Sequence, residues 1–226
     1  MAFRLDRVVP WGRSFAEYQR MFALTHEQLS LRMLGCADGP ASFNAEATGH
    51  GADVVSVDPI YTFSRAEIQS RIQACYPEMM RQVRQNYSEF VWREIPSVED
   101  LGRLRMASME LFLDDYEVGR KCGRYLAAEL PSLPFQDRAF ELALCSHFLF
   151  LYADQFSLEF HVNSISELCR VADEVRIFPL VELGSVPSRH RCSVTETLRR
   201  RGFSVNVEHV DYEFQRGGNQ MVRIVK

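Results

Sequence analysis

The sequence predicts an α/β fold that is doubly wound around a mostly parallel sheet. Residues 31–59 contain, in order, a short apolar run, a turn of small residues, a helical segment and a second apolar run that ends on a carboxylate. Apolar runs and helical patterns alternate again after residue 124, which is typical of parallel α/β sheets. Two β runs, 204–214 and 220–225, flank Gly217-Gly218, and this hairpin signal predicts an antiparallel last strand.

The turn after the first apolar run is built from small residues. Leu31–Leu34 is followed by Gly35, Ala37 and Gly39, which are small enough to let the backbone pass close to a ligand. Pro40 is expected to open the next helix, where its missing N–H costs nothing. This turn therefore predicts a ligand site at the carboxyl end of the first strand.

An acid ends the second apolar run. Val54–Val57 leads into Asp58, roughly twenty residues after the turn, where a doubly wound sheet places a carboxylate against ribose hydroxyls. The turn departs from the G-x-G-x-x-G dinucleotide pattern, because Ala37 replaces the second glycine and Asp38 adds negative charge. An anionic pyrophosphate would be poorly served there, so these residues favour a ligand without phosphate and disfavour a nicotinamide-dependent oxidoreductase.

From these residues the chain resembles the class I S-adenosylmethionine-dependent methyltransferases. Their first motif is a strand followed by G-x-G-x-G or a variant, and their second is a strand ending in an acid, as in VVSVDP here. Tyr125–Phe135 and Phe140–His147 look like the family's third and fourth strands. The resemblance covers Arg32–Leu183 apart from one insertion, and it implies a seven-stranded Rossmann-like sheet with an antiparallel last strand, S-adenosyl-L-methionine as cofactor, and methyl transfer.

The resemblance also implies cofactor-binding residues in the first two turns. The first turn would pass along the amino-acid and ribose portions of the cofactor, and Asp58 would bind the ribose. The first-turn residues are Gly35, Cys36, Ala37 and Gly39.

Further residues would complete this site. Pro59 and Ile60 would flank the adenine, while Glu129 and Leu130 would address the adenine edge. Ser146, at the end of the fourth strand, would close the site near the sulfur.

Residues 1–30 are expected to form an N-terminal helical cover over the cofactor. The segment 14–30 favours a helix that restarts at a capping box of Thr25 and Gln28. Arg13 could meet the methionine carboxylate through its fork of donors. The alternative is that the aromatic residues of this segment only pack the helix onto the sheet.

About sixty residues separate the second and third strands, far more than one crossover helix requires. Residues 61–123 are therefore predicted to be a helical insertion, with helix starts at Ser64 and Ser97 and with Pro77 and Pro96 punctuating the helices. The insertion leaves the sheet at the ligand-binding edge, which favours a lid or a substrate-selecting cap. A buttress or a dimer surface is the alternative.

His147 is the candidate general base, since it follows the fourth strand at the ligand edge; a purely structural role is the alternative. Arg216 and Asn219 in the final hairpin are candidates for the site rim. The six cysteines are dispersed and show no zinc spacing, so no metal is expected.

We expect residues 1–226 to form a single domain. Composition also limits the partners that this chain can bind. A net charge of -4 disfavours binding to nucleic acid, and neither a membrane-spanning run nor a secretory signal is visible. We expect a cytoplasmic enzyme acting on a small molecule, with a homodimer and a protein or RNA acceptor left open. A noncatalytic sensor or scaffold that binds S-adenosylmethionine is the alternative function.

Overall fold

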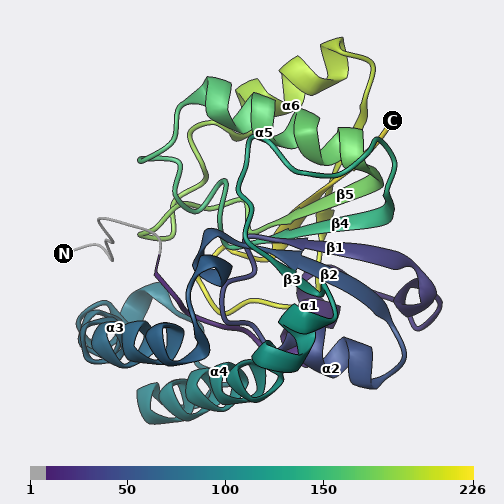
Figure 1. The fold of residues 1–226 in the computed structure, drawn as a ribbon. Helices are drawn as coiled ribbons and strands as arrows, with labels where there is room; N and C mark the ends of the chain where they lie inside the picture. The colour runs from purple at the N-terminus through teal and green to yellow at the C-terminus, as the bar shows by residue number, and fades with distance from the viewer. Residues whose placement is uncertain (1–8) are drawn as a thin grey trace.

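The computed structural model describes residues 9–226, so the first eight residues of the expected N-terminal cover lie outside it (Figure 1). Seven strands form one sheet in the order β3-β2-β1-β4-β5-β7-β6. Only β7 runs antiparallel to its neighbours, which confirms the predicted fold class. The strands are β1 (Arg32–Cys36), β2 (Asp53–Val57), β3 (Tyr125–Leu126), β4 (Phe140–Ser146), β5 (Ala172–Phe178), β6 (Ser204–His209) and β7 (Gln220–Val225).

Helices cover both faces of the sheet. In Figure 1, α5 and α6 lie on one face and α1 and α2 on the other, and each face has its own buried apolar cluster. None of the helices in residues 9–226 combines the length and the apolar character needed to cross a bilayer. The helices are α1 (Phe15–Met21), α2 (Phe43–Gly49), α3 (Arg65–Gln85), α4 (Val98–Lys121), α5 (Leu158–Val171) and α6 (Arg191–Arg200).

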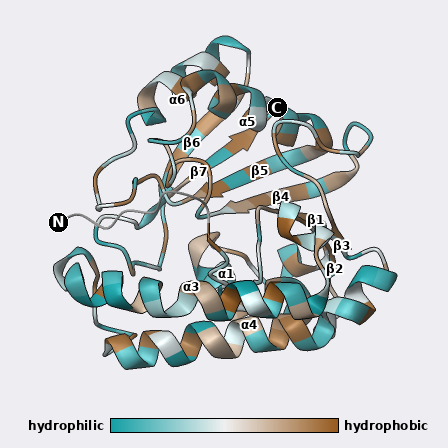
Figure 2. Cartoon of the chain, turned by 60° about the vertical axis from the view of Figure 1, so that its left-hand side comes forward, coloured by the Kyte–Doolittle hydropathy of each residue, from teal (hydrophilic) through white to brown (hydrophobic). Residues whose placement is uncertain are grey.

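The helical insertion between β2 and β3 is confirmed, and it consists of α3 and α4 lying side by side (Figure 2). Both helices start where the sequence predicts. Ser64 forms a capping box with Glu67, and the Ser97 side chain accepts a hydrogen bond from the Asp100 amide. The helix α4 packs against α2 and β3, which fixes the insertion to the core of the fold.

Three local predictions were wrong. Pro40 lies in a turn and α2 begins at Phe43, because Ala37 and Gly39 both adopt positive φ and keep the chain out of helical geometry. Pro77 lies inside α3, whose two halves pack into different apolar clusters on either side of it. The expected helix 14–30 is split into α1 and a short 3₁₀ helix.

The split of that N-terminal helix has a local cause. Ala23 adopts φ +47°, which ends the first helix, although Thr25 and Gln28 do exchange the hydrogen bonds of the expected capping box. The shortened α1 keeps its own capping box at Ser14 and Glu17. Its buried face packs on α2 within the apolar cluster on that face of the sheet.

Candidate functional site

A two-lobed cavity lies at the carboxyl edge of the parallel strands, where open α/β sheets bind their ligands. The wide lobe has a volume of about 620 Å³ and the narrow lobe about 110 Å³. Residues shared by both lobes define what we call the junction. These residues are Val9, Ala37, Gly39, Asp58 and Phe148.

Asp58 ties the first turn to the second. Its Oδ2 accepts a hydrogen bond from the Gly39 amide at 2.9 Å, and its Oδ1 accepts one from the Ile60 amide at 2.8 Å. Each carboxylate oxygen keeps a further lone pair for a ligand hydroxyl. Burial raises the pKa of Asp58 to about 6.

Gly35 does not line either lobe. A Cβ built on it would lie 1.8 Å from Oδ2 of Asp38, so its missing side chain makes room for that carboxylate. Oδ1 of Asp38 accepts a hydrogen bond from the Tyr18 hydroxyl at 2.8 Å, and Oδ2 accepts one from Ser56 Oγ at 2.6 Å. Burial also raises the pKa of Asp38 to about 6. The missing side chain at Gly35 therefore gives room to the Asp38 carboxylate.

The wide lobe brings together the residues expected to surround adenosine. They come from the ends of β1 and β2 and from the loop after β3. Leu130 is buried, while the Glu129 side chain is exposed at the opening. The expected residues in this lobe are Cys36, Ala37, Gly39, Asp58, Pro59, Ile60, Glu129 and Leu130.

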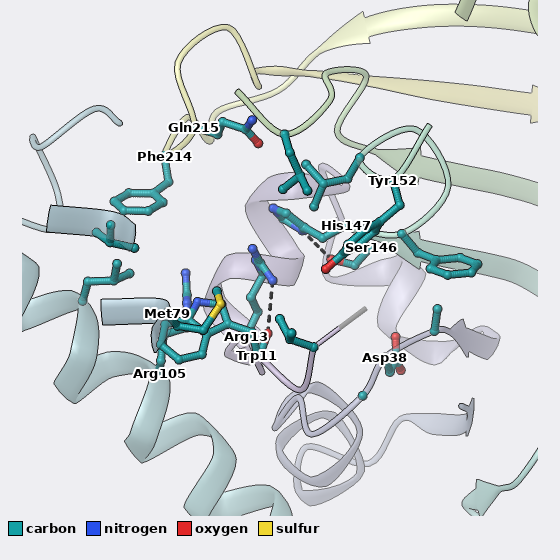
Figure 3. A pocket seen from close by; sticks show the side chains of 18 of the residues that line it. Trp11, Arg13, Asp38, Met79, Arg105, Ser146, His147, Tyr152, Phe214 and Gln215 are labelled. Atoms are coloured by element: carbon teal, nitrogen blue, oxygen red, sulfur yellow. Dashed lines mark hydrogen bonds between the residues drawn. The ribbon is translucent and has the colours of Figure 1, made fainter. Parts of the chain in front are cut away.

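The narrow lobe contains His147, Ser146 and Arg13 (Figure 3). Nδ1 of His147 lies 2.9 Å from Ser146 Oγ, and the backbone amide of His147 donates to the Phe178 carbonyl at 2.6 Å. Burial, followed by the charges of Arg13 and Arg105, holds the pKa of His147 well below its usual value. The imidazole is therefore neutral at neutral pH.

Arg13 presents its guanidinium to the narrow lobe. Nη1 donates to the Trp11 carbonyl at 3.2 Å, whereas the buried Nε has no hydrogen-bond partner among residues 9–226. No carboxylate in that part of the chain forms an ion pair with Arg13. Burial and the neighbouring Arg105 lower the pKa of Arg13. A ligand anion would satisfy this guanidinium.

Sequence reasoning missed the ion pair behind the narrow lobe. Arg105 of α4 donates from Nη1 and Nη2 to the two oxygens of Glu17 at 2.6 and 2.7 Å. The Tyr212 hydroxyl donates to Glu17 at 2.8 Å. The network joins α1, α4 and the C-terminal hairpin, and no sequence signal marks it because the partners lie 88 and 195 residues apart.

The hairpin contributes other residues than those expected. Phe214 and Gln215 line the narrow lobe (Figure 3), while Arg216 donates to the carbonyls of Ser88 and Phe90. Neither Arg216 nor Asn219 lines the cavity. Arg216 is not part of the cavity lining because its guanidinium binds carbonyls of the segment between α3 and α4.

The insertion helix α3 lines both lobes. Met79 and Val83 face the narrow lobe, and Arg71, Ala74 and Cys75 face the wide lobe. The second insertion helix, α4, contributes Leu101 and Arg105 to the narrow lobe and packs against α2 and β3. One helix of the insertion therefore contacts the cavity along much of its length, and the other anchors it.

Two other chemistries gain no support. No group of three His, Cys, Asp or Glu side chains within residues 9–226 is arranged to hold a metal ion. A hydrogen bond with Cys145 and burial raise the pKa of the Cys36 thiol well above its usual value, which disfavours the thiolate that nucleophilic catalysis requires.

The sheet order and the place of the cavity define the fold of the class I S-adenosylmethionine-dependent methyltransferases. The mitomycin 7-O-methyltransferase MmcR aligns with 94% of this chain at a TM-score of 0.50 and 10% identity, and the chain spans 53% of MmcR. The magnesium protoporphyrin IX methyltransferase ChlM of Synechocystis PCC 6803, solved with bound SAM, aligns with 88% of this chain, over 72% of its own length, at a TM-score of 0.47 and 14% identity.

A relative by sequence identifies the family. The chain is 34% identical over 221 residues to the uncharacterized protein MJ0045 of Methanocaldococcus jannaschii, and the alignment covers 97% of each protein. The chain belongs to the same family as MJ0045. No family model matches it.

Proposed function

We propose that the protein binds S-adenosylmethionine and transfers its methyl group to a small-molecule acceptor. The observation that carries this proposal is the carboxylate of Asp58, which lines both lobes and keeps lone pairs free for two ribose hydroxyls. The fold shared with methyltransferases supports the same assignment.

The adenosine portion is assigned to the wide lobe. Asp58 would accept from the ribose, and Pro59, Ile60 and Leu130 would enclose the adenine. Glu129 lies at the opening, where its carboxylate could accept from the adenine amino group. A cavity of about 620 Å³ falls within the range of about 300–1,000 Å³ that is usual for small-molecule sites.

The amino-acid portion is assigned to the narrow lobe. Arg13 has free donors there, including an orphaned Nε, and a carboxylate would pair with its planar fork. This assignment gives an anionic partner to a guanidinium that forms no ion pair within residues 9–226. When bound, S-adenosylmethionine supplies a methyl group on a positively charged sulfur.

His147 is proposed as the general base for an acceptor that must lose a proton. Its imidazole is neutral, its Nδ1 is engaged with Ser146, and its Nε2 has no hydrogen-bond partner within the described residues. The alternative is structural, since the ring packs edge-on against Phe178 at a centroid distance of 5.3 Å. In that case His147 only holds the end of β4.

The helix α3 is proposed to act as a cover, because it lines both lobes. A small-molecule acceptor fits this arrangement better than a nucleic acid, since the net charge of the chain is -4.

The second candidate function is a noncatalytic sensor. The position of His147 beside the cavity favours the enzyme, whereas a sensor needs no base.

Transfer of a radiolabelled methyl group from S-adenosylmethionine to metabolites of a cell extract separates the enzyme from the sensor. We expect label in a small-molecule fraction with the wild type. The His147→Asn variant keeps a residue that tolerates the positive φ of 51° at this position, and it should lose about 10²- to 10⁴-fold in rate. Unchanged transfer with lowered stability would instead support the structural role, and binding without transfer would support the sensor.

A further inference from the structure

The volumes of the two lobes restrict where an acceptor can bind. The narrow lobe, at about 110 Å³, is smaller than a cavity of about 150 Å³ that holds one benzene. An amino-acid group paired with Arg13 would therefore leave no room there for a whole second molecule, and only the reacting group of an acceptor would reach His147 from the junction. The wide lobe is far larger, and it is lined by further side chains besides the residues assigned to adenosine.

Three phenylalanines that contact one another also line the wide lobe. Phe148, Phe156 and Phe160 form a wall, which we call the aromatic annex together with Ala74 and Cys75 of α3. Phe156 and Phe160 stack at 4.5 Å between centroids with an interplanar angle of 16°, and Phe148 meets Phe156 edge-on at 5.1 Å. Because Phe148 also belongs to the junction, a ligand in the annex can extend its reacting atom toward the cofactor sulfur.

The annex has a cation at its edge. Arg71 lies one turn before Ala74 and Cys75 on α3, and its guanidinium carbon is 3.7 Å from the centroid of Phe63. No ion pair or hydrogen bond holds this guanidinium within residues 9–226. A guanidinium that stacks flat on a ring keeps its edge N–H donors free for a carboxylate.

We propose that the acceptor is a planar aromatic molecule carrying a carboxylate, with its ring in the aromatic annex and its carboxylate on Arg71. This inference rests on the proposed function, since it places adenosine on the Asp58 side of the same lobe. Aromatic rings gain from stacked and edge-on contacts with a wall of this kind. The charge of the carboxylate distinguishes the acceptor from a neutral ring of the same size.

Three probes test the ring and the charge separately: benzoate, benzamide and cyclohexanecarboxylate. Each is titrated into the full chain saturated with S-adenosylhomocysteine, and binding is followed by ligand-observed NMR. We expect benzoate to bind about two- to fivefold more tightly than benzamide, as an ion pair with an exposed guanidinium provides, and more tightly than cyclohexanecarboxylate. Equal affinities for benzoate and benzamide, or no binding of benzoate, would overturn the proposal.

A matched pair of variants locates the charge. Arg71→Gln should remove the preference for benzoate over benzamide and leave binding of S-adenosylhomocysteine unchanged. Arg81→Gln, an exposed arginine further along α3 that pairs with Glu78 and does not line the cavity, should change neither. A loss of S-adenosylhomocysteine binding in Arg71→Gln would assign Arg71 to the cofactor and contradict the inference, whereas no binding of S-adenosylhomocysteine by the wild type would refute the proposed function itself.

Discussion

The Gly39 amide donates a hydrogen bond of 2.9 Å to Oδ2 of Asp58, nineteen residues further along the chain. The bond links the turn after β1 to the turn after β2 at the junction of the two lobes. Asp58 thereby fixes the shape of the cavity and presents its remaining lone pairs to a ligand. One carboxylate has a structural role and a proposed binding role at the same place.

Gly35→Ala is expected to destabilise the fold. The added Cβ would lie 1.8 Å from the buried Asp38 carboxylate, which two hydrogen bonds hold in place. Overpacking of this kind costs about 1–3 kcal/mol. Gly49→Ala is the matched control: its Cβ meets nothing within 4 Å at the end of α2, and it should be neutral or stabilise by up to about 1 kcal/mol. Urea unfolding of both variants measures the difference, and equal stabilities would contradict the packing described for Asp38.

Arg105→Met should lower the free energy of unfolding by about 3–5 kcal/mol, because it leaves the Glu17 carboxylate buried without its cation. The double variant Arg105→Met with Glu17→Gln should recover part of that loss. As a control, Arg84→Gln breaks the exposed ion pair with Glu99, where we expect less than about 1 kcal/mol. If Arg105→Met were no more harmful than Arg84→Gln, the ion pair would not hold α1 to α4.

Asp38→Asn should change how stability depends on pH. Burial raises the pKa of Asp38 from 3.8 to about 6 in the folded protein. The folded state therefore binds the proton more tightly, and this contribution to stability is complete below about pH 4 and is lost as the pH rises through about 6. Between pH 4 and pH 7 the wild type should lose on the order of 2–3 kcal/mol relative to Asp38→Asn. Thermal unfolding of both proteins across this range measures the difference, and parallel curves would refute the raised pKa.

Structural features that depend only on neighbouring residues in the chain could be predicted from local sequence signals. Ser64 and Ser97 mark helix starts because a cap needs only the next three residues, and Asp58 is found by its place at the end of an apolar run. The alternation of elements predicted the mostly parallel α/β class, and the resemblance implied the seven-stranded sheet that the structure shows.

Contacts between distant segments left no comparable signal. The buried face of α4 includes Arg105, whose partner Glu17 lies 88 residues away in the chain. The aromatic annex combines Phe148 with the start of α5 and with a face of α3, and only the folded chain brings them together. Likewise, Gln215 rather than Arg216 lines the cavity, because Arg216 binds the Phe90 carbonyl in the insertion.

Calorimetric titration of S-adenosylhomocysteine into the wild type and Asp58→Asn measures whether the Asp58 carboxylate binds the cofactor. We expect binding by the wild type, no comparable binding of NAD, and a loss of about 2 kcal/mol, or about thirtyfold in affinity, in the variant. Asp53→Asn, which removes an exposed acid at the start of β2, serves as the control and should bind as the wild type does. Equal binding by the wild type and Asp58→Asn, or tighter binding of NAD than of S-adenosylhomocysteine, would contradict the proposed binding of the cofactor by Asp58.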